Sequence, residues 1–154
     1  MKHEAYEAIH LLKLPLQIES LTAYGDKLLV GTKQGHLLTY SITPRYGDQK
    51  HEPHLLGYNK NYSKKPIQQM AVVPELEILV RLSDNVICVH DITNIINPVL
   101  LTTVQRTRGA TSFILNVKKH ISMTGATVPT VRMCVAVKRK LQFFYWKNKD
   151  FLDL

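Results

Sequence analysis

A few short stretches of this chain bring chemically active side chains together. His51-Glu52-Pro53-His54 places two imidazoles and a carboxylate close enough to suggest a metal pair. A helical metal site needs both histidines on one helical face, as in the spacing His-Glu-x-x-His, and Pro53 prevents a regular helix here. We therefore interpret this stretch as a solvated loop and predict no bound metal.

A second stretch has the glycines of a phosphate-binding loop. Gly31-Thr32-Lys33-Gln34-Gly35 lacks the four-residue gap and the Gly-Lys-Ser/Thr ending of that motif, so it is typical of a turn. The two cysteines, Cys88 and Cys134, lie in apolar runs, where a free thiol packs as a small hydrophobe. No serine or cysteine has a catalytic partner that spacing singles out. The sequence favours a protein that is not an enzyme and holds no cofactor.

Two basic clusters are the candidate contact sites. Lys138-Arg139-Lys140 directly precedes the densest aromatic run, Phe143-Phe144-Tyr145-Trp146, and Lys64-Lys65 forms the second cluster. Such residues can bind single-stranded nucleic acid or an anionic membrane, at about 1 kcal/mol per basic residue, or they form a solvated turn without a partner. Because side chains alternate along a strand, we expect two of the four aromatics to pack inward, as core or inter-blade contacts.

The net charge of +8 is unevenly distributed along the chain. Residues 1–104 contain ten basic and ten acidic residues, whereas residues 105–154 contain ten basic residues and only Asp150 and Asp153 as acidic ones. The whole excess therefore lies in the last fifty residues. A balanced first part disfavours a nucleic-acid groove across the entire fold.

One hairpin pattern occurs three times. LLVGTKQGHLLTYSI (28–42) aligns without a gap with ILVRLSDNVICVHDI (78–92), and MCVAVKRKLQFFYW begins a third copy at Met133. We expect three-residue turns at Lys33-Gln34-Gly35 and Ser83-Asp84-Asn85, because Gly and Asn tolerate the left-handed backbone. The turn at 138–140 offers neither residue, and only the strand pattern supports the third copy.

Further strand patterns flank each hairpin. IESLTAY (18–24), IQQMAVV (67–73) and ATSFILNV (110–117) precede the hairpins; HLLGY (54–58) and VLLTTVQ (99–105) follow the first two, and FLDL begins a fourth strand in the last unit. Four strands per unit and a period near fifty residues predict an all-β chain, a β-propeller fragment. A mixed sheet or sandwich with coincidental spacing is the alternative.

The predicted blades span residues 13–60, 61–108 and 109–154. A propeller ring needs about four to eight blades, so we expect these three to stay open. EAIHLL (7–12) is a candidate closing strand for a blade that is absent here. The last blade is then expected to expose an unpaired edge and an apolar face.

The N-terminus does not have the pattern of a signal peptide. Glu4 and Glu7 stand where such a peptide is basic, and Lys13 and Pro15 interrupt the apolar run. No window approaches 18 uninterrupted apolar residues, so we predict no membrane span and a cytoplasmic location. The glycosylation triplet Asn61-Tyr62-Ser63 is then a chance match.

Four segments carry a resemblance to a known family: KLPLQIESL (13–21), LLVGTKQGHLLTY (28–40), NYSKKPIQQM (61–70) and RMCVAVKRKLQFFYW (132–146). Together they resemble the start of the citron-homology (CNH) domain, in the version that heads the HOPS tethering subunits of the vacuolar sorting protein thirty-nine, or Vam-six, type. The related CORVET subunit matches them less well.

The resemblance implies an N-terminal β-propeller, followed in the family by a long α-solenoid that this chain lacks. It implies a role in tethering late endosomes and autophagosomes to lysosomes or vacuoles, with other HOPS subunits and the late-endosomal Rab GTPase as partners. Guanine-nucleotide exchange has been proposed for some members, but no residue here supports it.

Two hypotheses of function follow. The first is a non-enzymatic interaction module of a tethering subunit, peripheral on the late endosome or lysosome, whose contacts include Lys138, Arg139, Lys140, Lys64 and Lys65. The second is a basic β-domain that binds RNA or single-stranded DNA. The aromatic run coincides with a repeat position expected to be buried, so nucleic acid is the less favoured partner.

Overall fold

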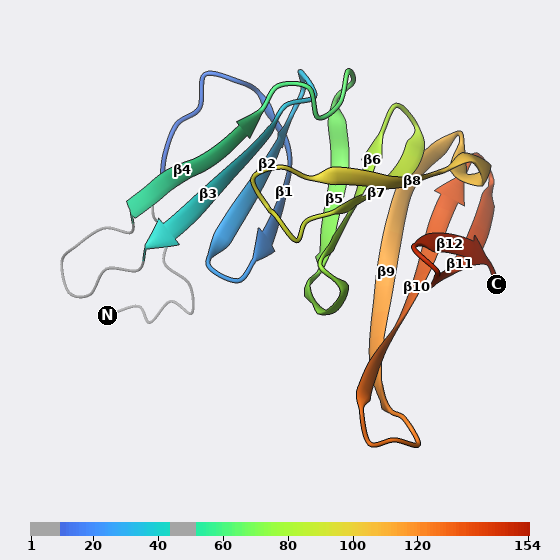
Figure 1. The fold of residues 1–154 in the computed structure, drawn as a ribbon. Coiled ribbons are helices and arrows are strands. Elements are labelled where there is room, and N and C mark those ends of the chain that lie inside the picture. Colours follow the sequence, from blue (N-terminus) through green and yellow to red (C-terminus); the bar gives the residue numbers. More distant parts are fainter. Residues whose placement is uncertain (1–9, 44–51) are drawn as a thin grey trace, which may run out of the picture.

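A computed structural model describes residues 10–43 and 52–154 of the protein. Within these ranges the chain forms three four-stranded antiparallel sheets, each a simple meander, and two short 3₁₀ helices (Figure 1). The first sheet contains β1 (Ile18–Tyr24), β2 (Lys27–Thr32), β3 (Leu37–Thr43) and β4 (Glu52–Asn59). The second contains β5 (Ile67–Val73), β6 (Ile78–Ser83), β7 (Val86–Asp91) and β8 (Val99–Val104). The third contains β9 (Ala110–Ile121), β10 (Thr127–Val137), β11 (Lys140–Lys147) and β12 (Asp150–Asp153).

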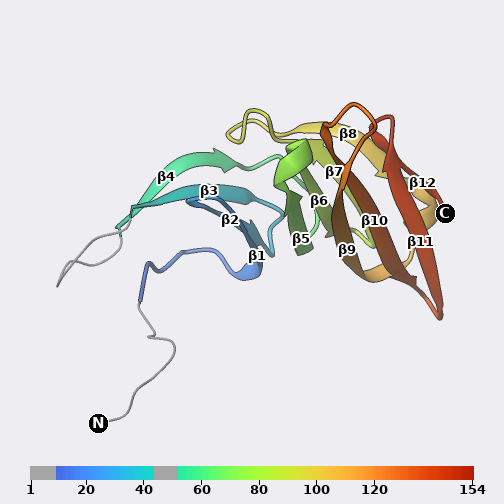
Figure 2. The same cartoon turned by 90° about the horizontal axis from the view of Figure 1, so that it is seen from below.

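The prediction of an open all-β propeller fragment is confirmed. The three sheets stand next to one another like blades, with β1, β5 and β9 as neighbouring inner strands (Figure 2). None of the sheets closes on itself. We refer to them as the first, second and third blades. The short helices η1 (Pro74–Leu76) and η2 (Gln105–Thr107) lie in the connections β5–β6 and β8–β9.

All three predicted hairpins form. Val30 pairs with Leu38 in the first hairpin, Val80 with Val89 in the second, and Cys134 with Phe143 in the third. The predicted fourth strands are also present, since β4, β8 and β12 contain 54–58, 99–104 and 150–153. The residues of EAIHLL numbered 10–12 adopt no regular secondary structure, and those numbered 7–9 lie outside the described residues.

The turns agree only in part with the sequence analysis. Gly35 has a φ of 86° at the end of a three-residue loop, as expected. The second loop has two residues rather than three, because Ser83 pairs directly with Val86 and both residues between them, at 84 and 85, have positive φ. In the third hairpin Lys138 adopts a φ of 57° although it is neither Gly nor Asn.

Two apolar interfaces hold the blades together. The interface between the first and second blades includes Leu29, Leu37, Tyr62, Ile67, Met70, Leu79 and Ile92. The interface between the second and third is larger and includes Val80, Leu82, Ile87, Val89, Phe113, Val131, Met133 and Phe144. The second blade has neighbours on both faces, so β6 and β7 are almost continuously apolar and buried.

The inner strand of each blade carries an irregularity at the same position. One residue is skipped in the pairing of β1, β5 and β9, and the residue after it is Ser20, Gln69 or Ser112. Ser20 Oγ donates to Ile67 O at 2.7 Å, and Gln69 bonds both the N–H and the C=O of Phe113, at 3.1 and 2.6 Å. In the first and second blades the bulge therefore places a polar side chain against the next blade.

Candidate functional site: a basic rim

The turns that carry the predicted basic clusters meet at one edge of the three blades, the upper edge in Figure 1. Between the first two blades, the N–H of Ser63 donates to Gly35 O at 2.9 Å. The hydroxyl of Ser63 lies 2.6 Å from that of Ser83 in the second blade. A Cβ atom on Gly35 would lie 2.2 Å from Ser63 O, so only glycine fits this contact. The β4–β5 loop is thus fixed against both blades.

The same edge continues into the third blade. The N–H groups of Gly109 and Ala110 both donate to Asn85 O, at 2.8 and 3.0 Å. The aliphatic part of Lys138 lies beside Gly109, within 3.4 Å of where a Cβ would be. A chain of direct contacts therefore joins the turns of all three blades.

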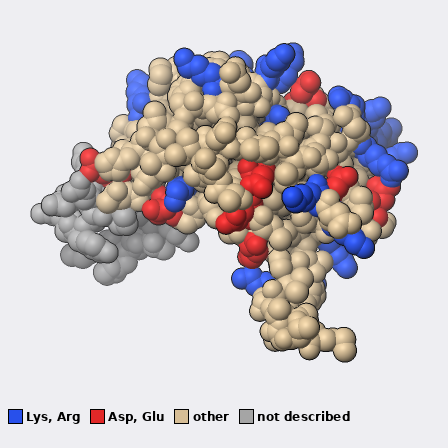
Figure 3. Space-filling view, viewed as in Figure 1, with Lys and Arg blue, Asp and Glu red and all other residues tan. Residues whose placement is uncertain are grey.

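Positive charge is concentrated on this edge, which we call the basic rim. Its exposed cationic residues without an ion pair among the described residues include Lys33, Lys64, Lys65, Arg108, Lys138, Arg139 and Lys140. Arg106, two residues before Arg108, is also exposed but forms an ion pair with Asp153, and we do not count it in the rim. The exposed Asp84, in the β6–β7 turn, adds one negative charge. Figure 3 shows Lys and Arg gathered along the upper outline, whereas most Asp and Glu lie lower on the visible face.

Two ion pairs lie towards the opposite edge. Lys27 Nζ lies 3.0 Å from Asp26 Oδ1, and this hydrogen bond lowers the pKa of the Asp26 carboxyl. Lys119 Nζ lies 3.6 Å from Glu75 Oε1. Among the described residues, no carboxylate lies within ion-pair distance of a cation of the basic rim. Unpaired cations on one rim leave a net positive field there.

The structure thus brings together the two clusters that sequence analysis named separately. Lys64 and Lys65 lie in the β4–β5 loop, and Lys138, Arg139 and Lys140 surround the β10–β11 turn, so two different blades supply them. Nothing in the linear sequence connects these positions. The shared edge follows from the antiparallel meander, which returns the β2–β3, β6–β7 and β10–β11 turns to the same side.

The aromatic run alternates as expected. Phe144 is 1% exposed in the second interface, and Trp146 packs against the same cluster. Phe143, which points to the other face, is 54% exposed. A single strongly exposed ring in this run gives no row of rings on which successive bases could stack.

The remaining motifs fall in ordinary structural positions. The interpretation of 51–54 as a solvated loop is wrong in its described part, because Glu52, Pro53 and His54 belong to β4. β4 is the edge strand of its sheet, where a proline is tolerated. His51 lies outside the described residues. In the glycosylation triplet, Tyr62 is buried beneath the β4–β5 loop. Cys88 is buried and Cys134 partly buried, and both are free thiols. In residues 10–43 and 52–154 there is no metal-binding group of three or more His, Cys, Asp or Glu side chains.

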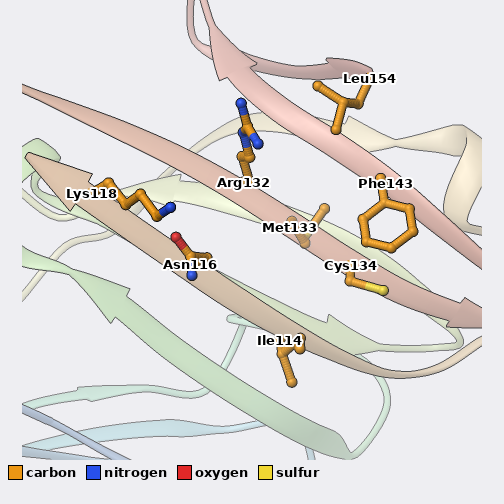
Figure 4. A pocket seen from close by; sticks show the side chains of 8 residues that line it. All are labelled: Ile114, Asn116, Lys118, Arg132, Met133, Cys134, Phe143 and Leu154. Carbon is orange, nitrogen blue, oxygen red and sulfur yellow. The ribbon is translucent and has the colours of Figure 1, made fainter.

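The outer face of the third blade is a second candidate surface. Ile114, Cys134 and Phe143 form a row across β9, β10 and β11, with Ile114 70% exposed (Figure 4). They line a shallow depression of about 320 Å³. Leu154 lies beside Phe143 at one end of it, and Arg132 lies further along β10 (Figure 4). This is the exposed apolar face expected for the last blade.

Sequence analysis missed a polar cluster between the first and second blades. The guanidinium carbon of Arg81 lies 4.9 Å from the centre of the Tyr62 ring, and Arg81 Nε donates to His90 Nε2 at 2.9 Å. The Tyr62 and His90 rings are 4.6 Å apart. Burial, with a smaller effect of the Arg81 charge, lowers the pKa of His90 to about 3, so His90 is neutral at physiological pH.

Comparison with known proteins identifies the family. A family model described as the CNH domain matches residues 24–154. The chain belongs to the CNH family. Within the described residues, no helix has the length and hydrophobicity that crossing a bilayer requires.

Several CNH relatives match the chain over most of its length. A Vam6/Vps39-like protein from Homo sapiens is 44% identical over 99% of the chain. A vacuolar protein sorting-associated protein 39 homolog from Drosophila melanogaster is 37% identical over 99%, and vacuolar sorting protein 39 from Arabidopsis thaliana is 32% identical over 73%. The chain spans only 18%, 17% and 12% of these relatives, respectively.

Proposed function

We propose that this chain is a non-enzymatic interaction module of a HOPS-type tethering subunit, acting where late endosomes or autophagosomes meet lysosomes or vacuoles. Its partners are the late-endosomal Rab GTPase and other HOPS subunits, and it is peripheral to the membrane. The observation that carries the proposal is the match to Vam6/Vps39-like proteins over nearly the whole chain.

The basic rim is the proposed contact with the GTPase or with anionic lipid. Its cations come from all three blades and have no carboxylate partner among the described residues, so their charge is available to a partner. Such a field speeds encounter with an acidic surface and is screened by salt, with a Debye length of about 8 Å at physiological ionic strength. The rim would then accelerate association with a partner that other contacts select.

The test compares association rates at low and physiological salt. Replacing Lys138, Arg139 and Lys140 together with Ala should slow binding of the GTP-loaded GTPase or of anionic vesicles, and the defect should shrink as salt rises. The control is Lys147→Ala with Lys149→Ala, two exposed cations at the opposite end of β11. Equal association rates of the triple variant and the parent at low salt would mean that this turn is a solvated loop with no role in binding.

A further inference from the structure

The basic rim contains a groove whose lining differs from the rest of the surface. It has a volume of about 360 Å³ and lies between the β4–β5 loop and the strands β6, β7 and β8. Its lining combines polar and cationic side chains with apolar ones: Asn61, Tyr62, Ser63, Lys64, Lys65, Arg81, Ser83, Asp84, Val86, Cys88 and Thr103. We call it the Arg81 groove.

Arg81 lacks a counter-charge. It is partly buried, and no carboxylate among the described residues lies within ion-pair distance of it. Its one hydrogen bond within those residues runs from Nε to His90, which leaves the terminal amino groups free to donate. A partly buried guanidinium with no anionic partner is costly, and bidentate recognition of an oxyanion is its strongest interaction.

The groove also holds Arg81 in a fixed orientation. The Tyr62 ring stacks on its guanidinium from one side, and neutral His90 accepts its Nε–H. The Tyr62 hydroxyl is buried and lacks a hydrogen-bond partner among the described residues. A donor that its neighbours already hold in place loses less conformational entropy when it binds a polar ligand.

The wall opposite Arg81 is equally fixed. Ser83 Oγ donates to Lys65 O at 3.1 Å, and the N–H of Lys65 donates to Ser63 Oγ at 3.2 Å. These bonds place the exposed side chains of Lys64 and Lys65 at the mouth of the groove. With Arg81 they provide three positive charges against the single negative charge of Asp84.

We propose that the Arg81 groove binds a phosphate monoester, carried by a phosphoinositide headgroup in a membrane or by the same headgroup free in solution. Arg81 would bind two phosphate oxygens, with Lys64 and Lys65 closing over the group from the mouth. The Asn61 amide and the Thr103 hydroxyl suit a polyhydroxylated ring. The remaining rim cations extend over three blades along the same edge and add electrostatic attraction to an anionic surface.

This inference adds a ligand site to the function proposed above and does not depend on the GTPase. The matched variants each remove two exposed charges: Lys64→Gln with Lys65→Gln at the groove, and Lys138→Gln with Arg139→Gln elsewhere on the rim. Vesicle sedimentation compares two membranes of equal surface charge. One contains phosphatidylcholine with a phosphatidylinositol monophosphate, the other phosphatidylcholine with phosphatidylserine.

We expect the parent to prefer phosphatidylinositol monophosphate vesicles by about tenfold in affinity, the effect of one or two charge-assisted hydrogen bonds. The groove variant should lose this preference, whereas the rim variant should bind both membranes more weakly and keep it. Equal affinity of the parent for both membranes, or equal effects of the two variants, would mean that binding depends only on overall charge. Either result would contradict a specific site for the headgroup in a membrane.

A solution measurement separates the sources of the phosphate. Titration with the soluble inositol phosphate headgroup, followed by NMR, should shift the Arg81 Nε–H and Tyr62 ring signals saturably in the parent and the rim variant. Saturable shifts without vesicle preference would assign the site to the free headgroup. No saturable shift, or tighter binding of a phosphoserine peptide than of the headgroup, would contradict the proposal. Circular dichroism checks that each variant is folded. Arg81→Lys keeps the positive charge but loses the planar fork of the guanidinium, so it tests the bidentate contact with phosphate.

Discussion

The two interfaces between neighbouring blades are built differently. The interface between the second and third blades is a continuous apolar cluster, sealed by Gln69 against the backbone of Phe113. The interface between the first and second contains a smaller apolar cluster and, towards the basic rim, the polar group of Tyr62, Arg81 and His90. The apolar interface between the second and third blades stabilises their packing. The interface between the first and second blades has less apolar contact and instead holds the Arg81 guanidinium in place near the rim.

The largest effect is expected in the apolar interface. Phe113 is 2% exposed, so Phe113→Ala should lower the free energy of unfolding by about 3 to 5 kcal/mol through lost burial and a cavity. The neighbouring Ile114 points to the opposite, exposed face, and Ile114→Ala should change it by no more than about 0.5 kcal/mol. Denaturant titrations of both variants measure the difference. Similar values for the two would mean that the blades do not pack as described.

The polar interface should make stability depend on pH. Folding depresses the pKa of His90 from 6.5 to about 3, so the unfolded chain binds a proton more readily between those values. The free energy of unfolding is therefore unaffected above pH 6.5 and falls as the pH drops below it, by about 2 kcal/mol at pH 5. Denaturation at pH 7 and pH 5 should show this loss in the parent. The same loss in His90→Asn would assign it to other groups.

A smaller difference is expected from the bridging side chains. Gln69→Ala removes two hydrogen bonds to Phe113 and should cost about 1.5 kcal/mol, whereas Ser20→Ala removes one bond to Ile67 and should cost about 0.5 to 1 kcal/mol. Both residues follow the inner-strand bulge of their blades. Thermal melts rank the two variants, and a reversed order would show that the bulge does not position equivalent bridges.

The smallest effect on stability is expected at the basic rim. Replacing Lys138, Arg139 and Lys140 with Ala should change the free energy of unfolding by no more than about 0.5 kcal/mol, because exposed turn residues contribute little. The same variant should show the binding defect described above. A stability loss of several kcal/mol would instead assign these residues to the fold.

The strands were predictable because each hairpin repeats an apolar pattern at a constant spacing. Val30, Val80 and Val135 are all buried in the strands that open their hairpins, and period-two alternation decides which side chains face a neighbour. Turn details were less predictable. The pairing of Ser83 with Val86 shortens one loop, and the position next to Gly109 accommodates Lys138 at a positive φ, where a sequence reading expects Gly or Asn.

The candidate site was predictable only in its parts. The two basic clusters were recognisable from composition, but their shared edge requires the relative placement of blades. The Arg81 groove had no sequence signal, since Tyr62, Arg81 and His90 are separated by 19 and 9 residues and each alone is unremarkable. Contacts between side chains of different strands determine that site.

The central claim is that the basic rim, rather than the opposite edge or the outer face of the third blade, meets the partner. Amide hydrogen exchange of the chain, alone and with the GTP-loaded GTPase or anionic vesicles, tests it directly. We predict new protection at the rim turns, including Gly35, Lys65, Asn85 and Arg139, with no change at the β9–β10 turn. Protection confined to the β9–β10 turn or to the face around Ile114, with the rim unchanged, would contradict the account.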